Sequence, residues 1–389
     1  MVRFAHMADV HLGGWKQQPL QDLNFTSFQK AIDICIQEKV DFVLIAGDLF
    51  DSAYPPIEIL KKTFSEFKKL NDSKIPCFFI AGSHDYSVSG KTFLDVLENT
   101  GFCKNIANFE IINDELILNP TVHEGIALYG YPGKKTCLEV KDLRKMKLKP
   151  SDSTLFKILM LHTTIDKAKG DLPIDSVEAD GLPDVDYYAM GHLHIDFQYK
   201  NFVYPGPVFP NNFSELEKLK HGNFYIVDAD LKNFSVSLKK VELKIKEVEH
   251  AIFDIKNAVT ATEEIIFELN KRNLTDKIVL LRLKGELENS KVSNIDLPKI
   301  EEFVMKKGAY FILKNTHDLK TREEDIEFEV GEEDIEEETV KLYTEKNHSE
   351  LNRFTKQLID SLSIEKQEGE TSEGFSKRIF DESKKILNF

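Results

Sequence analysis

Residues 42–51 read FVLIAGDLFD, an apolar run that ends abruptly in a carboxylate, Asp48. A short run that is apolar on both faces is typical of a central β-strand covered on both sides. A polar group directly after such a strand lies at the carboxyl edge of the sheet, where ligand crevices form in α/β proteins. This stretch therefore predicts both a strand and the position of a functional side chain.

Four other apolar runs end in the same way, and amphipathic helical periodicity separates several of them. These runs are residues 3–8, 77–81, 156–161 and 187–190. The polar residues that follow them are Asp9, His11, His84, Asp85, His162, His192 and His194. Alternating strand and helix signals indicate an α/β sandwich, and parallel strands would bring all five carboxyl ends together.

These polar residues favour a metal centre. Buried carboxylates need partners, and imidazole combined with carboxylate suits Mn²⁺, Fe²⁺ or Zn²⁺. The donors exceed the needs of one ion, so we expect two ions bridged by Asp48, an arrangement that activates water and clamps a phosphoryl group. Each motif alone has a structural interpretation: Asp9 with His11 as a surface pair, Asp48 as a turn residue, His162 as a core histidine. The ordered set favours the metal interpretation.

Composition limits the protein class. With 389 residues, 41% of them hydrophobic, the chain has room for two to three domains with real cores. No apolar run of about 18 residues and no signal-peptide pattern is found, so we expect a cytoplasmic protein without a membrane segment, nucleoid-associated in a prokaryote of archaeal type. The four dispersed cysteines are expected to be reduced packing residues.

The net charge of −15 argues against a protein that coats nucleic acid by charge alone. Residues 321–340, however, hold eleven acidic residues and one arginine, so most of the excess lies in one short segment. A run of this kind is usually a solvated linker or an exposed helix start. The rest of the chain is close to neutral, and the Lys/Arg-rich stretch 141–149 could contact a phosphate backbone, although a solvated helical face is the commoner case.

The sequence predicts four parts. A catalytic α/β domain spans 1–240, a small α+β domain spans 241–320, an acidic linker spans 321–340, and a helical tail spans 341–389. The tail has two amphipathic stretches but too little apolar surface to fold alone, so we expect it to dock on a partner.

The motifs ADVHLG, AGDLFD, AGSHD, LHTT and GHLH resemble the calcineurin-like metallophosphoesterases, and among these the SbcD/Mre11 nucleases of DNA double-strand-break repair. The resemblance covers about the first 240 residues. It implies a four-layer α/β/β/α sandwich, a capping domain that shapes DNA access, and two Mn²⁺ ions per subunit. The GD-x-VDRG pattern of protein phosphatases is absent.

The same resemblance implies a role for each motif residue. Asp9, His11 and His194 would hold one ion, Asp48 would bridge, and His162 with His192 would hold the second. His84 would act near the scissile phosphate without binding metal, with Asp85 orienting it. One position departs from the family, because Ser83 stands where an asparagine usually ligates the second ion. The second ion is therefore expected to bind weakly.

The resemblance also implies partners. A homodimeric helical bundle would use Ile57, Leu60, Phe64, Phe67, Phe93, Val96 and Leu97, although an ordinary core-facing stripe explains these residues equally well. The tail would grip the coiled coil of an SbcC/Rad50-type ABC ATPase. The docking residues would be Leu351, Phe354, Leu358, Phe375, Ile379, Phe380 and Ile386.

These observations predict a manganese-dependent DNA nuclease, the catalytic subunit of an SbcCD-like complex acting on DNA ends. The resemblance to the family implies double-strand 3′–5′ exonuclease and single-strand endonuclease activity. Two alternatives stay open. One is a metallophosphoesterase of small phosphodiesters. The other is a DNA-end-binding scaffold whose nuclease activity is weakened by Ser83.

Overall fold

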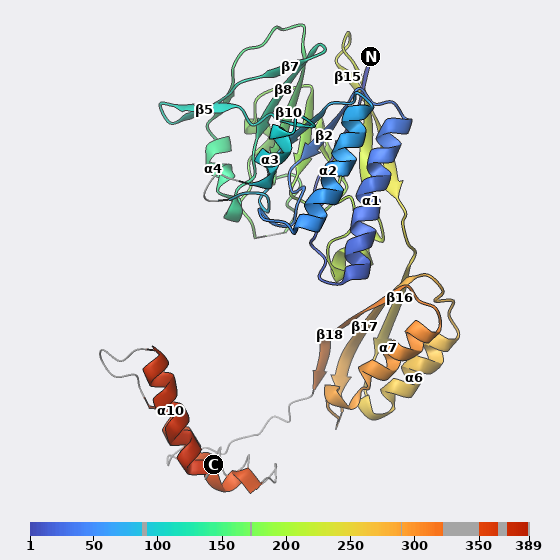
Figure 1. The fold of residues 1–389 in the computed structure, drawn as a ribbon, viewed down its shortest axis with the longest axis vertical. Helices are drawn as coiled ribbons and strands as arrows, with labels where there is room; N and C mark the ends of the chain where they lie inside the picture. The colour runs from blue at the N-terminus through green and yellow to red at the C-terminus, as the bar shows by residue number, and fades with distance from the viewer. Residues whose placement is uncertain (88–91, 172, 289, 322–349, 365–371, 388–389) are drawn as a thin grey trace. The chain divides into compact units, whose positions relative to one another are not determined.

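The computed structural model describes residues 1–87, 92–171, 173–288, 290–321, 350–364 and 372–387 (Figure 1). The chain divides into two units, Met1–Arg322 and Glu323–Phe389, which are considered separately. Most of the predicted acidic linker, 322–340, and the start of the predicted tail, 341–349, lie outside the described residues.

The first six-stranded sheet has the order β15-β14-β1-β2-β3-β4. Its strands are β1 (Val2–Met7), β2 (Phe42–Ala46), β3 (Cys77–Ile80), β4 (Lys104–Asn105), β14 (Gly222–Asp230) and β15 (Ser235–Leu243). β1 to β4 are parallel, whereas β14 pairs antiparallel with β1, and β15 pairs antiparallel with β14. Three helices cover its outer face: α1 (Gln18–Gln37), α2 (Ile57–Asp72) and α3 (Phe93–Asn99).

The second six-stranded sheet has the order β12-β13-β11-β10-β8-β7. Its strands are β7 (Thr121–His123), β8 (Ile126–Tyr131), β10 (Phe156–His162), β11 (Tyr187–Gly191), β12 (Phe197–Tyr199) and β13 (Phe202–Tyr204). The two sheets pack face to face through alternate residues, with Phe4 and Leu44 meeting Leu128 and Ile158 in one buried cluster. The central strands predicted from apolar runs are all present.

The outer face of the second sheet differs from the expected layer of helices. A three-stranded sheet, β5-β6-β9, covers it together with the short helix α4 (Glu139–Leu143) and irregular segments. These strands are β5 (Phe109–Ile112), β6 (Glu115–Leu118) and β9 (Met146–Leu148). In β6, Leu116 and Leu118 are buried in alternation, a strand period instead of a helical one. The fold is thus a mixed α/β sandwich with several mixed sheets.

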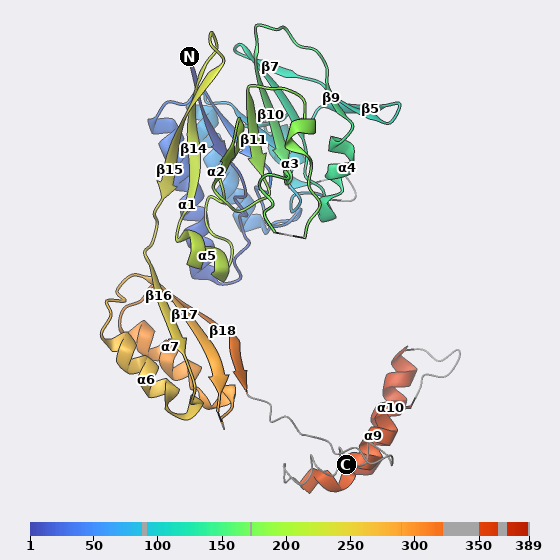
Figure 2. The same ribbon diagram turned by 180° about the vertical axis from the view of Figure 1, so that it is seen from behind.

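A small domain follows the sandwich within the same unit. It comprises β16 (Val248–Asp254), α6 (Ala258–Asn270), β17 (Ile278–Leu287), α7 (Leu297–Lys306) and β18 (Phe311–Thr321), as Figure 2 shows from behind. Its three strands are parallel, and α6 and α7 share one buried cluster with them. The side chains of Asn257 and Asp296 cap the two helices by accepting backbone N–H groups.

The residues predicted to form a dimer surface fall into two groups. Leu60, Phe67 and Leu97 are no more than 6% exposed and pack in the core beneath the first sheet's helices, so in this chain they face the core, and a dimer surface stays a prediction. Their periodicity marks the face that a helix turns toward its own sheet. Phe64 and Phe93 are half-buried against the same core, while Ile57 and Val96 are exposed.

The second unit contains η4 (Glu350–Phe354), α9 (Thr355–Leu362) and α10 (Ser372–Leu387). Of the predicted docking residues, Phe380 is 66% exposed. The half-buried ones are Phe354, Leu358, Phe375, Ile379 and Ile386, while the side chain of Leu351 lies outside the described set. Within the described part of the chain, no helix combines the length and apolarity needed to cross a bilayer.

Candidate metal centre

The carboxyl ends of strands from both sheets meet at one place and bring the predicted donors together. Three groups of donor atoms form, each with its atoms within 4.8 Å of one another. The groups are Asp9, His11 and His194; His11, Asp48 and His84; and Asp9, Asp48 and His162. Because His11, Asp9 and Asp48 are shared between groups, the donors form one continuous and largely buried cluster.

The backbone at this edge adopts unusual conformations. Asp9, His11, Asp48 and His192 have positive φ angles of 50°, 47°, 51° and 92°. Residues other than glycine rarely adopt this region, and such conformations cluster at functional sites. Hydrogen bonds between the loops that follow β1 and β2 hold the backbone in this conformation. The backbone N–H of Asp9 donates to the carbonyl of Gly47, and that of His11 donates to the carbonyl of Asp48.

Two glycines make room for the cluster. A Cβ atom at Gly82 would lie 2.2 Å from Asp48 Oδ1, and one at Gly191 would lie 2.0 Å from the carbonyl oxygen of Ala46. Neither distance is sterically possible without displacing the neighbouring strand end. Gly82 in AGSHD therefore permits the close approach of the loops that follow β2 and β3, and Gly191 in MGHLH permits the close approach of the two sheets at the site.

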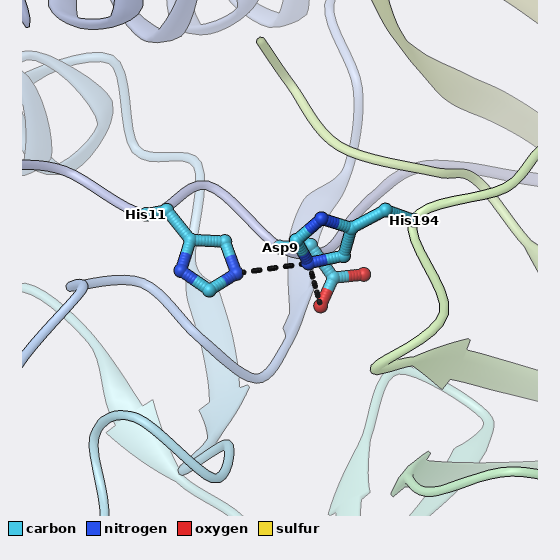
Figure 3. Close-up of side chains that lie close together, drawn as sticks. All are labelled: Asp9, His11 and His194. Atoms are coloured by element: carbon cyan, nitrogen blue, oxygen red, sulfur yellow. Dashed lines mark hydrogen bonds and ion pairs between the residues drawn. The ribbon is translucent and has the colours of Figure 1, made fainter. Parts of the chain in front are cut away.

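In the first donor group, two imidazoles converge (Figure 3). Nε2 of His11 lies 3.0 Å from Nε2 of His194, which is 3.8 Å from Asp9 Oδ1. The opposite ring atoms face acceptors: His11 Nδ1 lies 3.1 Å from Asp51 Oδ1, and His194 Nδ1 lies 2.9 Å from Glu215 Oε1. With each Nδ1 proton donated to a carboxylate, the facing Nε2 atoms require a proton or a cation between them.

The second convergence involves Asp48 and His162. His162 donates from Nδ1 to the carbonyl oxygen of Ala46 at 2.9 Å, which leaves its buried Nε2 3.1 Å from Asp48 Oδ2. That Nε2 has no hydrogen-bond partner. Asp48 Oδ2 is also 3.6 Å from His11 Nε2, so this carboxylate lies between the two convergences. Buried imidazoles and carboxylates arranged in this way fit a dinuclear metal centre.

His192 and Ser83 lie beside this cluster but outside its three groups. The backbone N–H of His192 donates to both carboxylate oxygens of Asp9, at 3.0 and 3.2 Å. Its Nε2 lies 4.0 Å from the Sγ of Cys137, a free and half-buried cysteine. Ser83 Oγ is 3.5 Å from Asp48 Oδ2. The donors predicted for the second ion are therefore less closely assembled than those for the first.

His84 lies at the solvent side of the cluster. Its side chain is 48% exposed. Its backbone N–H donates to Asp48 Oδ1 at 2.8 Å, and its ring atom Nδ1 lies 3.0 Å from the carbonyl oxygen of Asp51. The predicted contact from Asp85 is not found. Asp85 instead accepts backbone N–H groups from Leu49, Phe50 and Gly82 and so holds the two loops that carry Asp48 and His84.

Sequence reasoning missed two carboxylates. Asp51 faces both His11 and His84, and Glu215 faces His194. Asp51 lies in the motif GDLFD, and its position three residues after Asp48 was an available signal. Glu215 lies in the short helix α5 (Phe213–Leu219), and no local pattern connects it to a histidine 21 residues earlier.

The charges of the cluster shift the histidine pKa values in opposite directions. Burial disfavours protonated His162, but the charge and hydrogen bond of Asp48, the charge of Asp9 and the hydrogen bond to Ala46 together outweigh burial and raise its pKa to about 10. His194 is also buried, yet its hydrogen bond to Glu215 raises its pKa to about 9. For His192, burial together with the charge of His162 lowers the pKa to about 4.

Metal binding is therefore expected to release protons. Near pH 7, His162 and His194 are protonated in the metal-free protein, and an ion that binds either imidazole must displace its proton. Raising the pH toward 9–10 removes these competitors, so Mn²⁺ affinity should rise by roughly tenfold per pH unit for each proton released. Calorimetry in buffers of different ionisation enthalpy should count about two protons per chain, and an affinity that is constant between pH 6 and 8 would contradict this.

A cleft of about 620 Å³ opens beside the cluster. Ser83, His84 and His192 line it on the donor side, and Tyr54, Lys134 and Lys135 lie among its other lining residues. The lining also includes Asp51, and its two lysines offer positive charge to an anionic substrate placed next to the donors.

The family model for the calcineurin-like phosphoesterases matches residues 2–196. The DNA double-strand break repair protein Mre11 of Methanocaldococcus jannaschii is 30% identical over 62% of this chain and 66% of that protein. Its namesake from Archaeoglobus fulgidus is 25% identical over 83% of this chain and 76% of that protein. The Mre11 protein of Saccharolobus solfataricus is 33% identical over 50% of this chain and 50% of that protein.

Proposed function

We propose that this chain, which belongs to the calcineurin-like phosphoesterase family, is a manganese-dependent nuclease that acts on DNA ends. The observation that carries the proposal is the pair of His/Asp convergences that share Asp48 beside an open cleft lined in part by Lys134 and Lys135. The similarity to Mre11 proteins of three archaea supports DNA as the substrate.

Each residue has a proposed task. Asp9, His11 and His194 hold one ion, Asp48 bridges, and His162 and His192 hold the second with Ser83 nearby. Two ions bound in this way supply an activated water and a clamp for the phosphoryl oxygens. His84, exposed to the cleft and oriented by Asp51, donates a proton to the leaving oxygen.

The test is cleavage of a linear duplex with Mn²⁺ by the full chain. Nucleotides released from DNA ends, and abolished by chelation, support the proposal. Hydrolysis of a small phosphodiester with DNA untouched would overturn it in favour of a different phosphoesterase. Salt-sensitive DNA binding without cleavage would overturn it in favour of an end-binding scaffold.

Ser83→Asn is expected to tighten the second ion. Asparagine extends further than serine and carries an amide oxygen, a better neutral ligand than the hydroxyl that now lies 3.5 Å from Asp48 Oδ2. A Mn²⁺ titration should show one tight and one weaker ion in the parent, and two ions of closer affinity in the variant. Ser87→Asn, in the same cleft, is the matched control. Two equally tight ions in the parent would contradict the expectation.

The second unit is proposed to bind the coiled coil of an SbcC/Rad50-type ATPase. Its exposed apolar residues, among them Leu362 and Phe380, give α9 and α10 the faces that helix docking requires. Truncation after residue 340 is expected to abolish association with such an ATPase while metal binding is retained. Association measured by co-sedimentation that survives truncation would contradict this role.

A further inference from the structure

Helix α5 connects a proposed metal ligand with the small domain. Glu215 and Glu217 are two residues apart, so they point to nearly opposite sides of the helix. Figure 2 shows α5 on the side of the sandwich from which the chain leads into β16. The two carboxylates of this helix therefore face different parts of the molecule.

Glu215 is held firmly against His194. Its Oε1 lies 2.9 Å from His194 Nδ1, and its Oε2 accepts the backbone N–H of Asn211 at 2.7 Å. The side chain of Asn212 also donates to Oε1 while capping the helix by accepting the N–H of Glu215. Because these donors belong to α5 and the residues just before it, the position of the helix determines the position of the carboxylate.

Glu217 makes the corresponding link to the small domain. Arg282 of β17 donates from Nε and Nη2 to the two oxygens of Glu217, each at 2.8 Å, a two-pronged geometry that fixes both partners. The guanidinium also lies 5.1 Å from the ring centroid of Phe213 and donates from Nη1 to Asp318 at 2.6 Å. Arg282 is thus the point at which β17, β18 and α5 meet.

An apolar cluster surrounds this link. Leu216 of α5 is fully buried against Trp15 on the sandwich side and Ile278 and Leu280 of β17. Trp15 lies four residues after His11 in the same loop, and its indole N–H donates to the carbonyl of Pro210, just before α5. Trp15 therefore connects the loop of His11 to this interface, and the side chain of His194 reaches α5 through Glu215.

We propose that the small domain positions the first donor group through α5, with Glu215, Glu217 and Arg282 as positioning residues. Displacement of the small domain moves α5, and the His194 imidazole moves with Glu215. The small domain then regulates metal occupancy in addition to any role as a cap. The proposal rests on the proposed ligand role of His11 and His194, but not on DNA being the substrate.

The test is a titration of the full chain with Mn²⁺, in which electron paramagnetic resonance measures the concentration of the free ion. Glu215→Gln should lower the affinity of the first ion about 10- to 100-fold, the effect expected when a ligand loses its outer carboxylate. Glu217→Gln and Arg282→Gln leave that carboxylate in place, and each should lower it roughly 2- to 30-fold. The double variant Glu217→Gln/Arg282→Gln should bind Mn²⁺ no more weakly than either of its single variants, because both substitutions remove the same link between α5 and β17.

Arg272→Gln is the matched control, since the partners of this arginine are Glu249, the carbonyl of His250 and the ring of Phe253, all in the small domain, and none is Glu217. Its metal affinity should equal that of the parent. Unchanged affinity in Glu217→Gln and Arg282→Gln would overturn the proposal, as would an equal loss for both ions, which indicates general loosening. No DNA enters this measurement, so its outcome is separate from that of the cleavage test.

Discussion

Asp48→Asn is expected to abolish phosphodiester cleavage and to weaken metal binding more than about 100-fold, since losing even an outer partner of a ligand costs 10- to 100-fold. The reason is the position of Asp48 between both convergences, 3.1 Å from His162 and 3.6 Å from His11. Asparagine keeps the shape of the side chain but removes its charge. Without that charge, the pKa of His162 should also fall from its raised value of about 10.

Asp41→Asn is the control for this variant. Asp41 directly precedes β2, whereas Asp48 closely follows that strand. The carboxylate of Asp41 accepts the backbone N–H of Arg3 at 2.7 Å, at the opposite end of β2 from the metal donors. Metal titration and cleavage of a labelled duplex should give parent-like values for this control. Cleavage by Asp48→Asn that stays within tenfold of the parent would refute the bridging role.

The second large effect is expected for His84→Gln, with cleavage reduced about 10²- to 10⁴-fold and metal affinity unchanged. Glutamine retains a polar side chain but cannot deliver a proton to the leaving oxygen. The loss should therefore be much smaller with a nitrophenyl phosphodiester, whose leaving group departs without protonation. This dependence on the leaving group is the measurement that identifies a proton donor.

His84 also lies in a donor group with His11 and Asp48, so the opposite outcome is informative. If His84→Gln lowers metal affinity as strongly as it lowers cleavage, His84 is a ligand and its proposed role is wrong. His317→Gln is a suitable control, because the side chain of this small-domain histidine is 93% exposed. Its cleavage rate should match that of the parent.

The strands that carry the site were predictable because each is a local signal. A short apolar run followed by Asp9, Asp48 or His162 needs no distant partner to be recognised, and parallel pairing then brings the ends together. The antiparallel addition of β14 to β1 was not predictable in this way. It joins Val2 to Ala229, and local periodicity carries no information on a pairing at that separation.

The site was predictable to the same extent. Side chains at strand ends were found, whereas the carboxylate that orients His194 was not, since Glu215 belongs to a helix of seven residues defined by its cap and its packing. Asp85 was assigned to the neighbouring histidine, but its burial and three backbone partners give it a structural task. Adjacency in sequence is a poor guide to contact at a turn, where successive side chains diverge.

The donors belong to different layers of the protein: Asp9 and Asp48 follow strands of one sheet, whereas His162 ends a strand of the other sheet and His192 follows one. A cation held between them would act as a clamp across the interface of the two sheets. By mass action, an ion present at 100 times its dissociation constant stabilises the folded state by about 2.7 kcal/mol. Separation of the sheets and loss of the catalytic centre would then be one event, so the resistance of the sandwich to unfolding would depend on the supply of metal.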